Sequence, residues 1–158
     1  KSYTMPFYFG LKEDGVALIN NDGPMNRHRD QAAELKERRA KLYYFPATKI
    51  SLEVAGMDLA TNMALMGCIG AITGLTSMVG LDQAVKDRFL GKGFVVSGGT
   101  AALDSVVERK FKKKQELIDK NVAVMRAGWN YAVDHGWAAP NVKREDEPVA
   151  TETATATA

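Results

Sequence analysis

The feature that most constrains the fold of this chain is the run from Leu59 to Gly80, which contains no charged side chain although 25% of the whole sequence is charged. Small residues recur in it at helical spacing, at positions 60, 64, 67, 71 and 74, and larger apolar residues fill most other positions. A helix that is apolar on all sides is enclosed by its neighbours. Glycine in a helix interior costs about 1 kcal/mol relative to alanine, so its repeated use indicates close approach of another backbone. The run therefore predicts a buried central helix with a small-residue contact face.

A membrane span is the alternative for this run, because about 20 apolar residues are enough to cross a bilayer. Against a span, the run contains Asn62 together with several threonine and serine residues. Acidic residues flank it, and no basic cluster lies immediately beside it to set an orientation in a membrane. The core helix of a soluble protein is the simpler interpretation.

The length of 158 residues and the net charge of +2 suit one globular domain, or a large piece of one, and do not call for a nucleic-acid partner. The single cysteine, Cys68, excludes a disulfide framework and a thiol metal site within this chain. It favours a reducing, cytoplasmic compartment. The sequence begins at Lys1 without a signal-peptide pattern, and we expect that the numbering starts inside a longer polypeptide.

Two short apolar runs predict a parallel pair of strands. Val16 to Ile19 is continuously apolar, as in strands that are buried on both faces, and Leu42 to Phe45 forms a second strand that Pro46 ends. The segment between them, Pro24 to Lys41, is dominated by charge and predicts a solvated helical crossover. This order indicates an α/β domain. Polar residues 20–23 follow the first strand, where open α/β sheets bind ligands or partners; turn chemistry explains the same residues.

From Leu103 to the neighbourhood of His135 the apolar positions keep helical spacing, which predicts one long helix or two joined near Lys114. Its basic run, residues 109–114, is interpreted as a solvated helix face rather than a nucleic-acid surface. Beyond Pro140 the composition turns to charge and then to low complexity. We therefore place an α/β domain at residues 1–139 and a disordered or extended tail at residues 140–158.

A glycine turn lies before the long helix. Ser97, Gly98, Gly99 and Thr100 can present backbone N–H groups to an anion there. The turn lacks the lysine and the spacing of a P-loop and the three glycines of a dinucleotide fingerprint. A plain turn and helix cap is the alternative.

The order of the motifs resembles the gamma subunit, or gamma domain, of the thiamine diphosphate-dependent 2-oxoacid:ferredoxin oxidoreductases, the group that includes pyruvate synthase. The matching pieces are LKEDGVALINND, YYFPATKISLEVAG, TNMALMGCIGAITGL, LDQAVKDRF and FKKKQELIDKNVAVMRAGWNYA, about two thirds of the chain. The resemblance implies structural or interface signature positions at Asn62, Met63, Gly67, Asn121 and Gly128. We expect Asn62 to be buried and hydrogen-bonded, because a buried unpaired amide costs about 1–3 kcal/mol.

The same resemblance implies the fold. The chain is expected to be the C-terminal part of a three-layer, Rossmann-like gamma domain with a mostly parallel sheet and a helical C-terminal portion. The glycine-rich strand, turn and helix that open the family's gamma domain have no counterpart here, so the opening half is expected to be missing before residue 1. The charged segment 26–41 and an insertion at residues 93–102 also depart from the family pattern.

The resemblance further implies a non-catalytic gamma component of a complex that oxidatively decarboxylates a 2-oxoacid to an acyl-CoA and passes the electrons to ferredoxin. Pyruvate is the first expected substrate, with 2-oxoglutarate and phenylglyoxylate as alternatives. Thiamine diphosphate, Mg and 4Fe–4S clusters would belong to alpha, beta and ferredoxin-like delta partners. The chain would brace these subunits and border the path of CoA, with Ser97 to Thr100 touching a CoA phosphate. The alternative is a free-standing α/β binding or adaptor protein without redox chemistry.

Overall fold

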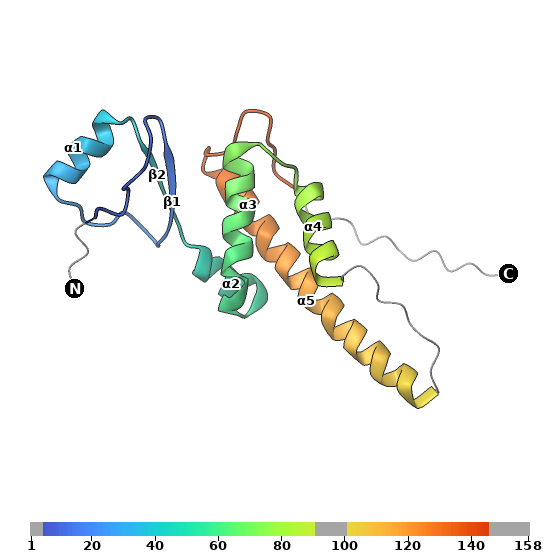
Figure 1. The fold of residues 1–158 in the computed structure, drawn as a ribbon. Coiled ribbons are helices and arrows are strands. Elements are labelled where there is room, and N and C mark those ends of the chain that lie inside the picture. Colours follow the sequence, from blue (N-terminus) through green and yellow to red (C-terminus); the bar gives the residue numbers. More distant parts are fainter. Residues whose placement is uncertain (1–4, 91–100, 146–158) are drawn as a thin grey trace.

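A computed structural model describes residues 5–90 and 101–145 of the chain. Two parallel strands, β1 (Val16–Asn20) and β2 (Lys41–Phe45), are joined by α1 (Arg29–Glu37). Helices follow, as Figure 1 shows. They are α2 (Ala47–Ala55), the short 3-10 helix η1 (Asp58–Ala60), α3 (Thr61–Thr73), α4 (Met78–Leu90) and α5 (Ala101–Asp134). The predicted α/β class and its parallel pairing are confirmed.

The strand pair has the crossover that the sequence predicts. Val16 lies opposite Lys41 and Asn20 opposite Phe45, in parallel register. The crossover helix α1 is largely solvated, and it is anchored by Leu35, which is buried. The expectation that the first strand is buried on both faces is wrong, because Val16 is 45% exposed and the middle of β1 is only partly covered.

The charge-free run contains the end of η1, all of α3 and the start of α4. α3 ends at Thr73 because Gly74 adopts the left-handed conformation, with φ of 64°, and α4 begins at Met78. Small residues of α3 are buried, namely Ala64, Gly67, Cys68, Gly70 and Ala71. Large apolar residues of the same run are exposed, namely Leu59, Met66, Ile69, Leu75 and Val79. The expectation that neighbours enclose this helix on all sides is therefore wrong for the described residues.

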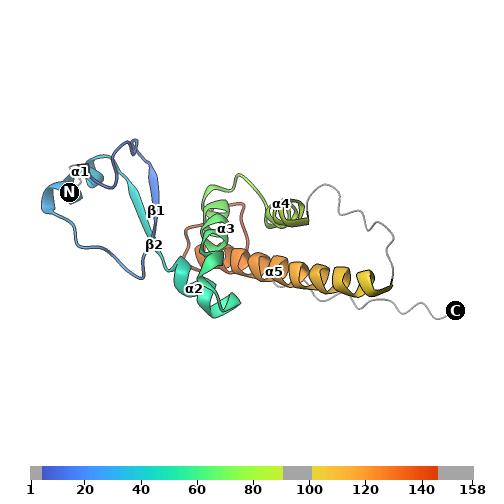
Figure 2. The same cartoon turned by 60° about the horizontal axis from the view of Figure 1, so that its bottom comes forward.

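α5 is one continuous helix, which decides between the two predicted alternatives. Its C-terminal half packs against α2 and α3, whereas its N-terminal half extends past them, as Figures 1 and 2 show. The basic residues Arg109, Lys110, Lys112 and Lys113 are exposed on this extension, as predicted for a solvated face. No helix within residues 5–90 and 101–145 is both long and apolar enough to cross a membrane.

Aromatic side chains connect the strand pair to the end of α5. Tyr43 stacks on Trp137 with ring centroids 4.7 Å apart, and Phe45 meets Tyr131 edge to face at 5.0 Å. Phe45 is fully buried in the same hydrophobic cluster as Met125. The sheet therefore shares one core with the helices.

Residues 140–145, at the start of the expected tail, lie against the helices. The indole N–H of Trp129 donates to the Lys143 carbonyl oxygen at 2.8 Å. The main-chain N–H of Ala139 donates to the Ala71 carbonyl oxygen at 2.9 Å and brings this segment to the end of α3. The packed part of the chain thus continues to Glu145.

Candidate functional site

Two glycines let α3 and α5 pack with their backbones in contact. A Cβ atom on Gly67 would lie 2.8 Å from the carbonyl carbon of Met125 and closer still to its oxygen. On the other helix, a Cβ on Gly128 would lie 2.8 Å from the carbonyl carbon of Ala64 and again closer to the oxygen. Only hydrogen fits at either position. The small-residue face predicted for the central helix is therefore the surface on which α5 packs.

The other predicted signature positions are distributed differently. Asn121 is buried in α5, and its side-chain amide donates to the Leu117 carbonyl oxygen at 2.7 Å. Met63 is partly buried against the hydrophobic core. Asn62 is exposed, so the expectation of a buried amide is wrong: it lies two residues before Ala64 and therefore on the side of α3 that points away from α5.

The outward side of α3 carries an uncharged stripe that the sequence analysis did not separate from the core. We call it the α3 face, formed by Asn62, Met66, Ile69 and Thr73, all of which are exposed. Their spacing of four, three and four residues places them on one side of the helix. That spacing was visible in the sequence. The sequence analysis assigned these residues to the interior because the whole run is hydrophobic. Hydrophobicity does not show whether a neighbouring element covers a given side chain.

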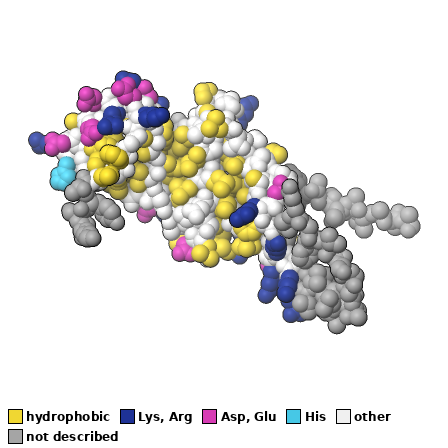
Figure 3. Space-filling model, viewed as in Figure 1, with side chains coloured by type: hydrophobic (Ala, Val, Ile, Leu, Met, Phe, Trp, Pro, Cys, Tyr) yellow, Lys and Arg dark blue, Asp and Glu magenta, His cyan; other side chains and the backbone are white. Residues whose placement is uncertain are grey.

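An apolar groove of about 520 Å³ continues from the α3 face to β1. Its lining is Val16 and Leu18 of β1 with Ile69, Ile72, Thr73 and Leu75. None of these side chains is charged, and Leu75 is 88% exposed. Figure 3 shows hydrophobic side chains gathered between the sheet and the helices, while charged side chains gather over α1 and over the extension of α5.

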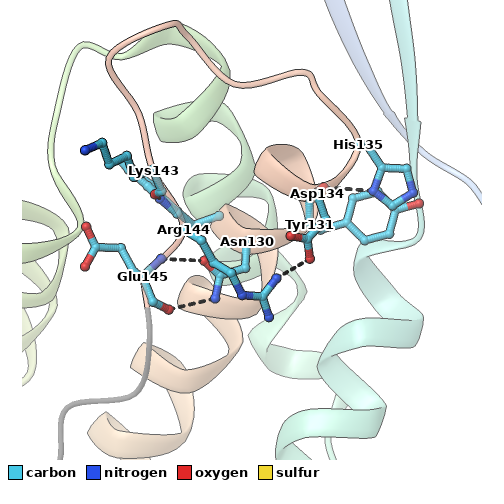
Figure 4. A network of polar contacts seen from close by, with 8 residues as sticks. Asn130, Tyr131, Asp134, His135, Lys143, Arg144 and Glu145 are labelled. Carbon is cyan, nitrogen blue, oxygen red and sulfur yellow. Dashed lines mark hydrogen bonds and ion pairs between the residues drawn. The ribbon is translucent and has the colours of Figure 1, made fainter.

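A second groove, of about 430 Å³, lies between α2, α5 and residues 144–145 and is lined by charged, polar and apolar side chains. Asn130 accepts from the Glu145 N–H at 2.9 Å and donates to the Glu145 carbonyl oxygen at 2.8 Å, while Arg144 pairs with Asp134, as Figure 4 shows. The groove also contains Arg126 and Glu53, so both charge signs are present. The described contacts in this groove hold residues 144 and 145 on α5.

The polar residues predicted after the first strand serve local structure. The Asn20 amide donates to the Thr48 hydroxyl at 2.9 Å, and the Thr48 N–H donates to the Asn20 side-chain oxygen at 3.3 Å. Asn21 donates to the Gly23 carbonyl oxygen at 2.6 Å. These bonds tie the end of β1 to the first turn of α2 and close the following turn. The turn-chemistry alternative accounts for them.

Cys68 is fully buried in α3. Burial raises the pKa of its thiol to about 12, so the reactive thiolate is scarce at neutral pH. Among the residues that the structure describes, no three His, Cys, Asp or Glu side chains form a group that could hold a metal ion. Ser97, Gly98, Gly99 and Thr100 lie outside the described residues, so their contact with a CoA phosphate stays a prediction.

Comparison with known proteins places the chain in a family. The sequence model of the family described as pyruvate ferredoxin/flavodoxin oxidoreductase matches residues 2–105, about two thirds of the chain. The chain belongs to this family. The resemblance seen in the motifs is thereby confirmed, and the α/β fold with its parallel strand pair is the form that this family takes here.

Curated relatives in the family are subunits of oxidoreductases. The pyruvate/ketoisovalerate oxidoreductases common subunit gamma of Pyrococcus furiosus is 33% identical over 84 residues, covering 52% of this chain and 43% of that protein. Pyruvate synthase subunit PorC of Methanothermobacter marburgensis is 34% identical over 85 residues, covering 54% and 42%. The 2-oxoglutarate synthase subunit KorC of Methanothermobacter thermautotrophicus is 26% identical over 77 residues, covering 49% and 40%.

The matches to these relatives take in less than half of each relative's length. No solved structure matches the chain. The strand pair and α3 lie within residues 2–105. The α3 face and the apolar groove therefore belong to the part of the chain that matches the family.

Proposed function

We propose that the chain is a non-catalytic gamma component of a multisubunit 2-oxoacid oxidoreductase and that its α3 face docks on another subunit. The observation that carries this proposal is the exposure of an uncharged, largely apolar surface, from Met66 and Ile69 to Leu75. Soluble monomers rarely expose large contiguous apolar patches, and such patches mark interaction sites. The relatives are named as subunits of oxidoreductases, which supports the same assignment.

We assign the redox chemistry to the partners. A 4Fe–4S cluster is held by four cysteine thiolates, whereas this chain has one cysteine, Cys68, which is buried and protonated. Thiamine diphosphate with Mg and the clusters would then lie on alpha, beta and delta subunits, and ferredoxin would accept the electrons. A reducing cytoplasmic compartment fits this chemistry and the single thiol.

The substrate proposed first is pyruvate, because several relatives carry that name, including the gamma subunit from Pyrococcus furiosus and PorC. One of those names adds ketoisovalerate, and KorC is named for 2-oxoglutarate. Phenylglyoxylate is an aryl 2-oxoacid of the same reaction class. A subunit that braces the complex does not choose among these acids, so the choice belongs to the catalytic subunits.

The proposal is tested by purifying the complex from the native source through an affinity tag on this chain. The expected result is co-purification of thiamine-binding and cluster-binding subunits, a brown preparation, and CoA-dependent reduction of ferredoxin with a 2-oxoacid. Testing pyruvate, ketoisovalerate, 2-oxoglutarate and phenylglyoxylate in the same assay identifies the substrate. A colourless monomer without such partners would support the free-standing adaptor instead.

A further inference from the structure

Arg126 is a half-buried cation in the groove between α2 and α5. Its guanidinium forms no ion pair or hydrogen bond with another of the residues that the structure describes. Glu53, the acidic residue that α2 contributes to the groove, lies 3.9 Å from the Lys49 ammonium instead. A carboxylate is the natural partner of such a guanidinium, because its two oxygens match the N–H groups. Arg126 is therefore placed to bind a carboxylate that enters the groove.

The main chain of residues 143–145 runs toward Arg126. Asn130 holds the Glu145 main chain by hydrogen bonds of 2.9 and 2.8 Å. Figure 4 shows the chain from Lys143 to Glu145 passing beside α5, away from the helix end at His135. Arg126 lies one turn further in that direction and on the same face as Asn130, because residues four apart share a helix face.

Two more residues of chain cover the remaining distance. The turn from Asn130 to Arg126 advances about 6 Å along the helix axis. An extended chain advances about 3.3 Å per residue, so the second residue after Glu145 comes level with Arg126. The next two residues in the sequence are Asp146 and Glu147, which lie outside the described residues and are both acidic. Chain length and charge thus lead to the same pairing.

We propose that the carboxylates of Asp146 and Glu147 bind Arg126, so that the chain's own C-terminal segment closes the groove between α2 and α5. Charge-assisted hydrogen bonds are about twice as strong as neutral ones, so this pairing would fasten the segment more firmly than the Asn130 bonds do. The groove would then be filled from within the chain, in contrast to the α3 face. The inference does not depend on the proposed function, because every group in it belongs to this chain.

The direct measurement is nuclear magnetic resonance of the Arg126 side-chain Nε–H in the full chain. A guanidinium held by carboxylates exchanges this proton with water more slowly than a free one. Exchange should be about fivefold faster in the double variant Asp146→Asn, Glu147→Gln than in the wild type. Equal rates in the two proteins would overturn the inference. Equally fast exchange would mean that the guanidinium stays in water above its apolar stem, and equally slow exchange that another group holds it.

A charge exchange gives an independent test through the Glu145 amide, whose hydrogen bond reports whether the segment lies on α5. Arg126→Glu places like charges together and should speed exchange of that amide about tenfold. Adding Asp146→Arg and Glu147→Arg should return the rate to within about twofold of the wild type. Lys110→Glu makes the same charge change at an exposed position of α5 and should leave the rate unaltered. Failure of the added arginines to restore the rate would contradict the pairing.

Inorganic phosphate distinguishes an external anion from the chain's own carboxylates. Added to the wild type, phosphate should leave the Arg126 Nε–H exchange unaltered, because the guanidinium is already occupied. Added to the double variant Asp146→Asn, Glu147→Gln, it should slow the exchange, because the guanidinium is then free. Slowing of the same size in the wild type would show that the groove is open to external anions and would overturn the inference.

Discussion

Gly67 lies directly against the main chain of Met125, so that a Cβ on Gly67 would stand 2.8 Å from the Met125 carbonyl carbon. Gly128 stands in the same relation to Ala64. Each glycine, which has no side chain, thus lets the backbone of the other helix lie against it. A shorter distance or a rotation between α3 and α5 would break these backbone contacts. This pair of contacts orients α3 and thereby decides which of its side chains face outward.

The glycine contact predicts a large effect of one methyl group. Gly67→Ala and Gly128→Ala should each lower the free energy of unfolding by about 3 kcal/mol, because the backbone on the other side cannot yield as a side chain would. Urea unfolding followed by circular dichroism measures this. Gly80→Ala is the control: its Cβ would meet only the Thr76 and Ser77 hydroxyls, at 3.3 and 3.4 Å, and alanine favours the helix. Equal stability of Gly67→Ala and Gly80→Ala would contradict the contact.

The hydrogen bonds between Asn130 and the Glu145 main chain predict a change in proteolysis. Asn130→Ala removes both hydrogen bonds to the Glu145 main chain. Trypsin should then cleave after Lys143 or Arg144 about tenfold faster, since two bonds of about 1 kcal/mol each hold this segment closed. Asn62→Ala changes an exposed asparagine elsewhere and should leave the rate unaltered. A cleavage rate that does not respond to Asn130→Ala would show that these bonds do not restrain the segment.

Burial of Cys68 predicts the pH dependence of stability in alkaline solution. The folded pKa is raised to about 12, so the unfolded chain loses the thiol proton first as the pH rises. The contribution of this thiol to stability is therefore complete below the unfolded pKa, about 8.5, and is lost progressively as the pH rises toward the folded value. Urea unfolding at a series of pH values should show a steeper alkaline decline for the wild type than for Cys68→Ala. Parallel declines would refute the assignment.

The same burial predicts slow labelling of the native thiol. At pH 8 a disulfide reagent should react with Cys68 only as fast as the chain opens, and with the urea-unfolded chain at the rate of a free thiol. The absorbance of the thiolate that the reagent releases measures both rates. Rapid labelling of the folded chain would mean that solvent reaches Cys68.

The buried hydroxyl of Tyr44 predicts a substitution that does not lower the free energy of unfolding. Its hydroxyl is buried without a hydrogen-bond partner among the described residues. Tyr44→Phe should therefore leave the free energy of unfolding unchanged or raise it by up to about 1 kcal/mol, because an unpaired buried hydroxyl has already lost its water. Tyr8→Phe is the contrasting variant and should lower stability, since the Tyr8 hydroxyl donates to Glu34 at 2.7 Å. Thermal melting of the two variants distinguishes these outcomes; a marked loss in Tyr44→Phe would reveal a partner for that hydroxyl.

The local elements were predictable from particular residues. The apolar run at Val16, the stop at Pro46 and the charged crossover between them led to a parallel pair, which is what forms. Helical spacing of apolar residues led to α5. In these segments the hydrophobic period and the backbone limits of proline act over a few residues, so no distant partner is needed to specify them.

The positions of the exposed residues followed from tertiary structure. Asn62, Met66 and Ile69 belong to the same charge-free run as Ala64 and Gly67, and composition does not distinguish the two sides of that helix. The main chain of Ala64 packs on Gly128, which is distant in sequence, and the opposite side of α3 therefore faces solvent. The sequence by itself determined the parallel strand pair, the helical character of the segments that follow it, and that small residues would meet a backbone. The packing of α3 on α5 decided which apolar residues remain uncovered, because burial depends on what lies opposite a side chain and not on the side chain alone.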